Sequence, residues 1–188
     1  MGRIIFVTGG ARSGKSRFAE ELLAGMDNVL YIATAIAFDD EMRERIKLHR
    51  ERRNPLWSTF EGSSGLGEKI LSSSSSHEAI LLDCITIMVT NLMLENHNTD
   101  WDKVTPAETV LIEKRINAEI DELIKSIVNF HGMTVIVSNE VGMRIVPATP
   151  LSRHFRDIAG KINQKIAAAA DDVYFTVSGI PMKIKGDK

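Results

Sequence analysis

Short apolar runs rich in β-branched residues recur along the chain, each bounded by glycines or polar residues. Such runs are typical of strands buried in a sheet. They lie at residues 3–8, 29–33, 79–82, 133–138, 173–178 and 182–185. Residues 57–61 are predicted to be irregular or a short strand.

Longer segments with helical spacing of apolar residues separate most of these runs. The predicted helices span residues 15–24, 39–53, 65–71, 85–94, 106–130 and 150–170. The longest has Pro106 near its first turn, a favoured position for proline, and an apolar stripe along one face. The stripe consists of Ile112, Ile116, Ile120, Leu123 and Ile127. The serine run 72–76 and the polar segment 97–105 are predicted loops.

The alternation of strands and helices predicts an α/β fold, with a mostly parallel sheet covered by helices on both faces. Only Gly179, Ile180 and Pro181 separate the last two apolar runs, which predicts a C-terminal antiparallel hairpin. No repeat or composition shift marks a boundary. We therefore expect residues 1–188 to form a single domain.

Composition narrows the class of protein. Apolar residues make up 44% of the chain and charged residues 26%, and the formal net charge is −2. These values favour neither a nucleic-acid partner nor a membrane surface, and the sequence predicts a cytoplasmic protein without a signal peptide. The single cysteine, Cys84, rules out a disulfide framework and is expected to be a small buried apolar side chain.

The strongest motif is Gly9-Gly10-Ala11-Arg12-Ser13-Gly14-Lys15-Ser16, which matches the full phosphate-loop pattern between a predicted strand and a helix. Glycines at both ends of the loop allow close backbone approach, so the N–H groups turn inward around an anion. Lys15 is expected to contact the β- and γ-phosphates of ATP or GTP, and the Ser16 hydroxyl to ligate Mg²⁺.

An enzyme with this loop usually holds Mg²⁺ with an acidic residue at the end of a neighbouring strand. Asp83 follows the apolar run 79–82 and is the candidate. The competing interpretation is that Asp83 caps the helix that begins near Thr86.

The helix predicted over residues 39–53 is rich in charge. Arg45 and His49 are four residues apart and share a face, with Arg52 and Arg53 on roughly the same side. A histidine among arginines fits contact with phosphate. By spacing alone, however, a solvated helical face is the stronger interpretation of this segment.

Further motifs follow along the chain. Leu30-Tyr31-Ile32-Ala33-Thr34 comes first, then His49-Arg50, Leu81-Leu82-Asp83-Cys84-Ile85-Thr86 and Met88-Val89-Thr90-Asn91-Leu92. Ser138-Asn139-Glu140-Val141-Gly142, Ile145-Val146-Pro147 and Arg153-His154-Phe155-Arg156-Asp157 complete the series. With the phosphate loop, and in this order, they resemble the bifunctional adenosylcobinamide kinase / adenosylcobinamide-phosphate guanylyltransferase family of cobalamin biosynthesis over nearly the whole chain.

The resemblance implies two reactions: phosphorylation of adenosylcobinamide with ATP or GTP, then transfer of GMP from GTP to the product through a guanylyl-histidine. It places that role on His49 and implies a homotrimer. The nucleotide contacts that it implies are the phosphate loop together with Ala33, Thr34, Ala35, Arg50, Glu51, Arg52, Arg53, Glu61 and Asp83.

Three positions depart from the family pattern. Asp83 stands where glutamate is common, and Arg144 stands where glycine is expected. Leu48 replaces a second histidine of some members, which leaves His49 as the candidate nucleophile of that helix.

Two other functions remain open at this stage. One is a phosphate-loop kinase for a small molecule without guanylyl transfer. The other is a GTP-binding regulatory protein or assembly ATPase, although the sequence has no Asn-Lys-x-Asp run for selecting guanine. The segments around Asn139-Glu140 and 153–157 either hold the strand end to the last helix or line the corrinoid pocket.

Overall fold

The computed structural model describes residues 2–35, 40, 43–44, 47, 50–51, 53–95, 99–143 and 145–187. Its strands are β1 (Ile4–Gly9), β2 (Val29–Ala33), β3 (Ser58–Glu61), β4 (Ala79–Asp83), β5 (Met133–Asn139), β6 (Asp172–Val177) and β7 (Ile180–Lys185). Its helices are α1 (Lys15–Glu21), α3 (Leu66–Ser73), α4 (Ile85–Leu94), α5 (Pro106–Asn129) and α6 (Pro150–Ala169).

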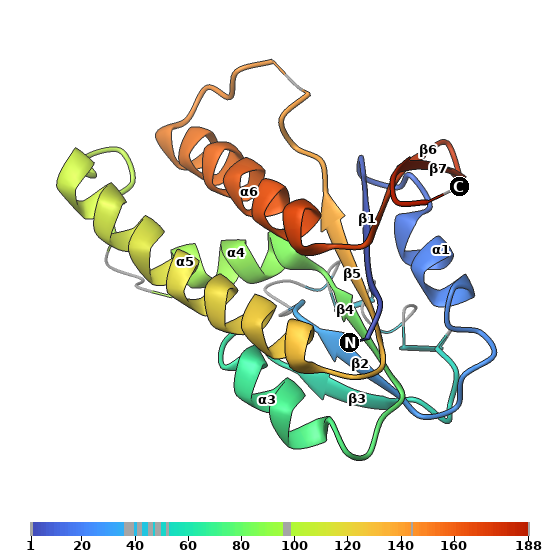
Figure 1. Cartoon of the computed structure of the whole chain (residues 1–188). Helices are drawn as coiled ribbons and strands as arrows, with labels where there is room; N and C mark the ends of the chain where they lie inside the picture. The colour runs from blue at the N-terminus through green and yellow to red at the C-terminus, as the bar shows by residue number, and fades with distance from the viewer. Residues whose placement is uncertain are drawn as a thin grey trace.

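The strands form a seven-stranded sheet in the order β3-β2-β4-β5-β1-β6-β7 (Figure 1). The pairs from β3 to β6 are parallel, and β7 pairs antiparallel with β6. The predicted mostly parallel sheet and C-terminal hairpin are therefore confirmed. The segment left open as irregular or strand contains β3, which pairs with β2.

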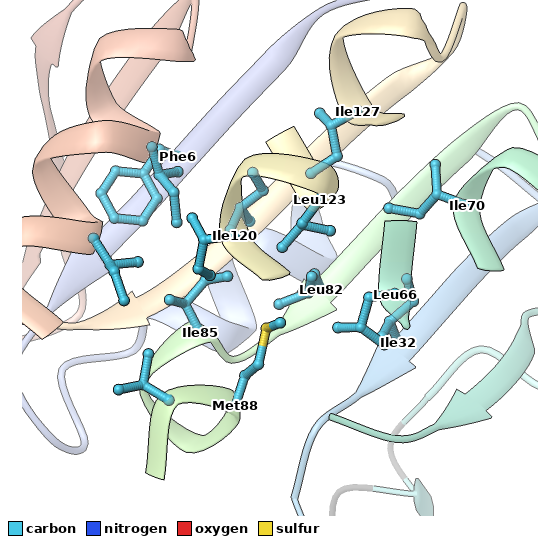
Figure 2. Packing of buried hydrophobic residues seen from close by; sticks show 14 of the residues in the cluster. Phe6, Ile32, Leu66, Ile70, Leu82, Ile85, Met88, Ile120, Leu123 and Ile127 are labelled. Atoms are coloured by element: carbon cyan, nitrogen blue, oxygen red, sulfur yellow. The ribbon is translucent and has the colours of Figure 1, made fainter. Parts of the chain in front are cut away.

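Alternate residues of each central strand enter two separate cores because side chains alternate across a strand. Phe6, Ile32 and Leu82 pack on one face against α3, α4, α5 and α6 (Figure 2). On the other face, Val7 and Tyr31 pack against α1 and Trp57. Helices thus cover both faces, as the alternation of elements predicts.

Some element ends differ from the sequence-based expectation. α1 ends at Glu21 and the chain continues in turns, where the amides of Leu23 and Ala24 donate to carbonyl oxygens three residues back instead of four. α3 extends to Ser73, inside the serine run. α5 begins with a capping box between Thr105 and Glu108.

The parallel strands end at one edge of the sheet, which therefore gathers their last residues. The register pairs Ala33 with both Glu61 and Asp83, and Gly9 with Asn139. No helix in the described part of the chain is long and apolar enough to cross a membrane.

Candidate active site

The phosphate loop connects β1 to α1 at this edge. Gly14 has φ 94°, a left-handed conformation that disfavours a side chain, and a Cβ there would lie 3.1 Å from the Cα of Gly179. At Gly9 a Cβ would lie 2.4 Å from the carbonyl oxygen of Thr176. The geometry therefore requires glycine at both positions, as the motif predicts. Arg12 also has a positive φ, 56°, which the motif does not predict.

Lys15 folds back across its own loop. Its Nζ donates to the carbonyl oxygen of Gly10 at 3.0 Å, and the residue is 8% exposed. Burial lowers the pKa of Lys15, while the nearby Cys84 and Asp83 act to raise it. The negative charge of a bound phosphate would likewise favour the charged ammonium form of Lys15. Ser13 is buried and Ser16 is half-buried in the first turn of α1, whereas Ala11 and Arg12 are exposed.

Asp83 lies at the carboxyl end of β4 and is half-buried. The Tyr31 hydroxyl donates to Asp83 Oδ2 at 3.1 Å. Burial, and then the charge of Asp83, raise the pKa of Tyr31 well above its ordinary value, so this hydroxyl remains a donor. The N-cap of α4 is Cys84, and no side chain caps it. Helix capping therefore does not explain Asp83.

Thr34 has a structural role in addition to the nucleotide contact expected of it. Its Oγ1 accepts from the Cys84 amide at 2.9 Å and donates to the Cys84 carbonyl at 2.8 Å. Asn91 Nδ2 donates to the Thr34 carbonyl at 2.8 Å. These bonds fix the end of β2 to the start of α4, beside Ala33 and the half-buried Ala35.

A pocket of about 680 Å³ lies next to this edge. Its lining contains four of the expected contacts, Arg50, Glu51, Arg53 and Glu61, together with Asn54, Pro55, Trp57 and Thr59. Arg50 Nε donates to Glu61 Oε1 at 3.0 Å, and both side chains are about half-exposed. His49 and Arg52 lie outside the described residues, as does Arg144.

Arg53 is the pocket's most distinctive group. Its guanidinium carbon lies 3.7 Å from the centre of the Tyr31 ring. Its Nε and Nη1 atoms are buried and have no hydrogen-bond partner among the described residues. Buried donors of this kind are normally satisfied, which makes this pair a candidate contact for a ligand acceptor.

A polar network continues behind the edge. Asn139 Nδ2 donates to Thr86 Oγ1 at 2.6 Å, Asn163 Nδ2 donates to the Asn139 carbonyl at 3.1 Å, and Ser138 Oγ donates to Asn163 Oδ1 at 2.7 Å. Arg153 Nη1 donates to the carbonyl oxygens of Pro147 and Ala148. These contacts hold the end of β5 and its loop to α6, as the first of the two open interpretations requires.

Sequence reasoning missed Tyr31, Trp57 and Asn163 as parts of this region. Tyr31 carries two signals that were available: its place in the motif of residues 30–34, and a hydroxyl within the otherwise apolar strand 29–33. In the described part of the chain, no three histidine, cysteine, aspartate or glutamate side chains gather where they could hold a metal ion.

Comparison with known proteins agrees with the motifs. Residues 5–184 match the family described as cobinamide kinase / cobinamide phosphate guanyltransferase. The bifunctional adenosylcobalamin biosynthesis protein CobU of Escherichia coli (strain K12) is 48% identical over 186 residues, covering 97% of this chain and 99% of that protein.

A further curated relative also matches over nearly its whole length. The bifunctional adenosylcobalamin biosynthesis protein CobP of Pseudomonas aeruginosa is 39% identical over 182 residues, with 96% of each chain covered. A solved structure of the RadB recombinase has a TM-score of 0.49 and 18% identity, covering 93% of this chain and 74% of that one. With the family match spanning nearly its whole length, this chain belongs to the cobinamide kinase / cobinamide phosphate guanyltransferase family.

Proposed function

We propose that this protein phosphorylates adenosylcobinamide with ATP or GTP and then transfers GMP from GTP to adenosylcobinamide phosphate, forming adenosylcobinamide-GDP. The observation that carries the proposal is the arrangement at one sheet edge. A glycine-dependent phosphate loop lies close to a carboxylate, Asp83, and near a pocket whose Arg53 has buried donors with no partner in the described part of the chain. We take residues 1–188 as one nucleotide-binding domain with both activities.

In the kinase step, the hydroxyl oxygen of the aminopropanol arm attacks the γ-phosphorus, the nucleoside diphosphate leaves, and the hydroxyl proton is released. Gly9, Gly10, Ala11, Arg12, Ser13 and Gly14 would surround the phosphates with backbone N–H groups. Lys15 would stabilise the charge that develops on the transferred group.

Mg²⁺ fits this site if the nucleotide supplies some of its ligands. Magnesium is commonly held by one or two protein oxygens together with substrate phosphates. The Ser16 hydroxyl in the first turn of α1 and the Asp83 carboxylate at the end of β4 are the oxygens that would hold it. The bound ion would neutralise phosphate charge.

In the transferase step, a ring nitrogen of His49 attacks the α-phosphorus of GTP and pyrophosphate leaves. A phosphate oxygen of adenosylcobinamide phosphate then attacks the phosphorus of the guanylyl-histidine and frees the imidazole. A covalent intermediate of this kind divides one difficult displacement into two. Arg50, Arg52 and Arg53 are close to His49 in sequence, and Arg50 and Arg53 line the adjoining pocket.

The nucleotide and corrinoid substrates support placing the protein in the cytoplasm. We also propose that it forms a homotrimer, as the family resemblance implies. Neither nucleic acid nor a membrane has a role in this proposal.

Guanylylation of the chain tests the transferase function. Purified protein is incubated with Mg²⁺ and GTP labelled at the α-phosphate, and label on the denatured chain is measured. We expect an acid-labile, base-stable adduct in the wild type that is absent from His49→Ala. The matched control is His131→Ala, which changes an exposed histidine in the turn before β5.

Phosphate transfer from γ-labelled ATP or GTP to adenosylcobinamide is measured in parallel. Transfer without any adduct, with or without the corrinoid, would reduce the function to a phosphate-loop kinase. GTP binding with neither transfer nor adduct would favour a GTP-binding regulatory protein. An adduct that persists in His49→Ala would move the nucleophile to another residue.

A further inference from the structure

Tyr31 is a buried polar side chain to which the proposed reactions assign no part. It lies in the middle of β2, is 1% exposed, and packs in the core beneath α1 with Val29, Trp57 and Leu81. Hydrophobic packing accounts for the ring of Tyr31. It does not account for the hydroxyl, because a phenylalanine would fill the same space in the core.

The hydroxyl and the ring face of Tyr31 each contact a charged side chain of the proposed site. The hydroxyl donates to Asp83 Oδ2 at 3.1 Å, across the pairing of β2 with β4. That bond fixes one carboxylate oxygen. A partner that orients a metal-ligating carboxylate typically affects metal affinity or activity by ten- to a hundredfold.

The face of the ring carries the guanidinium of Arg53, 3.7 Å from the ring centre. A cation–π contact uses the flat face of the guanidinium and leaves its N–H edges unused. This explains how Arg53 is held in place while Nε and Nη1 have no partner among the described residues. The stacked arginine thus keeps donors for an acceptor in the pocket.

Two opposite charges contact different parts of this side chain. Arg53 and Asp83 both act electrostatically on Tyr31, from its face and its hydroxyl respectively. A smaller apolar side chain would let the guanidinium move towards the carboxylate. An ion pair formed there would consume the donors of Arg53 and the ligand oxygens of Asp83 together.

We infer that Tyr31 is a positioning residue that keeps Arg53 and Asp83 apart, orienting the carboxylate with its hydroxyl and the guanidinium with its ring. The inference rests on the proposed function for the roles of Arg53 with nucleotide and of Asp83 with the metal.

Equilibrium binding of GTP across a Mg²⁺ titration separates the two contacts. Tyr31→Phe keeps the ring and removes the hydroxyl, so we expect the half-saturating Mg²⁺ concentration to rise about tenfold with unchanged binding of metal-free GTP. Tyr31→Leu removes both contacts and is expected to weaken metal-free binding as well. Val29→Ala, on the same strand and face but at its far end, is the control for loss of packing.

A double-mutant cycle distinguishes positioning from stability. If the hydroxyl acts through Asp83, adding Tyr31→Phe to Asp83→Asn should change the Mg²⁺ dependence by less than about twofold. Wild-type Mg²⁺ dependence in Tyr31→Phe would overturn the inference, as would wild-type metal-free binding in Tyr31→Leu. The inference would also be overturned if Tyr31→Phe changed the Mg²⁺ dependence equally in the wild type and in Asp83→Asn. These are binding measurements, so a wild type that binds GTP but forms no guanylyl adduct would refute the transferase and leave this result standing.

Discussion

Cys84 shows how strongly one position at the sheet edge determines the chemistry of a side chain. It follows Asp83 directly and is 4% exposed. Its Sγ lies 3.2 Å from Thr86 Oγ1, and its backbone carries the two bonds to Thr34. Burial, and then the charge of Asp83, raise the pKa of Cys84 to about 11. The thiol therefore has a packing role, as its apolar sequence context indicates.

Alkylation with iodoacetamide at pH 8 tests this conclusion. The thiolate is the reacting form, so native protein is expected to react on the order of a hundredfold more slowly than protein unfolded in urea. Mass spectrometry counts the adduct, and Cys84→Ser serves as the blank. Because folding raises this pKa, the thiol's contribution to stability is fully present below the ordinary value of 9.0. It is lost as the pH rises through about 11. Equal alkylation rates in the two states would contradict the burial of Cys84.

Local spacing identified the phosphate loop and Asp83, because each depends on a few consecutive residues. The contact of Arg53 with Tyr31 could not be predicted this way. It joins residues from different elements, and it requires β2 and the segment before β3 to be placed together. Thr34 shows the same limit, since its bonds to Cys84 follow from the pairing of β2 with β4.

At the scale of elements, the C-terminal hairpin is tighter than the sequence suggests. The glycine and proline predicted a three-residue connection, but the turn consists of Ser178 and Gly179, with φ values of 51° and 83°. Two left-handed residues form the kind of turn that matches the twist of a hairpin. Ile180 therefore already pairs with Val177, and Pro181 is tolerated because β7 is an edge strand.

The hairpin is fixed to the start of the chain by Asp172, which is 2% exposed. Its carboxylate accepts from Arg3 Nε at 2.7 Å and pairs with Lys183 Nζ at 2.6 Å. Hydrogen bonding to Lys183, and then to Arg3, holds the pKa of Asp172 below its ordinary value of 3.8, against the effect of burial. One buried carboxylate thus ties β6 to β7 and to the residue before β1.

Replacing Asp172 with asparagine should lower the free energy of unfolding at pH 7 by about 2 kcal/mol, since hydrogen bonds to charged groups are lost. Because folding lowers this pKa, the carboxylate's contribution is fully present above pH 3.8 and disappears as the pH falls through the lowered value. Urea unfolding at pH 7 and at pH 3 measures both effects, with the exposed Asp102→Asn as control. A mutational cost that is unchanged at pH 3 would show that the charge of Asp172 is unimportant.

At the scale of the whole molecule, the periodicity of the chain predicted the class of fold but not its strand order. Parallel strands buried on both faces read as continuous apolar runs, so nothing in their composition reveals which strands are neighbours. β5 lies between β4 and β1 because crossover connections place it there, with α5 and α6 covering one face (Figure 1). That order decides the site, since it puts the end of β5 beside both the phosphate loop and Asp83.

Nucleotide binding at this edge should stabilise the entire fold, because the loop is attached to the central strand β1 and to α1. GTP at a hundred times its dissociation constant should add about 2.7 kcal/mol to the free energy of unfolding. For a chain of this length that raises Tm by about 5–10 °C. Lys15→Ala should lose most of this shift, because the ammonium at the loop is removed. Arg17→Ala should keep it, since Arg17 is exposed on α1 and pairs with Glu21. Differential scanning fluorimetry of the three proteins with and without GTP measures the shifts. A full shift in Lys15→Ala would mean that GTP stabilises the protein from a place other than the phosphate loop.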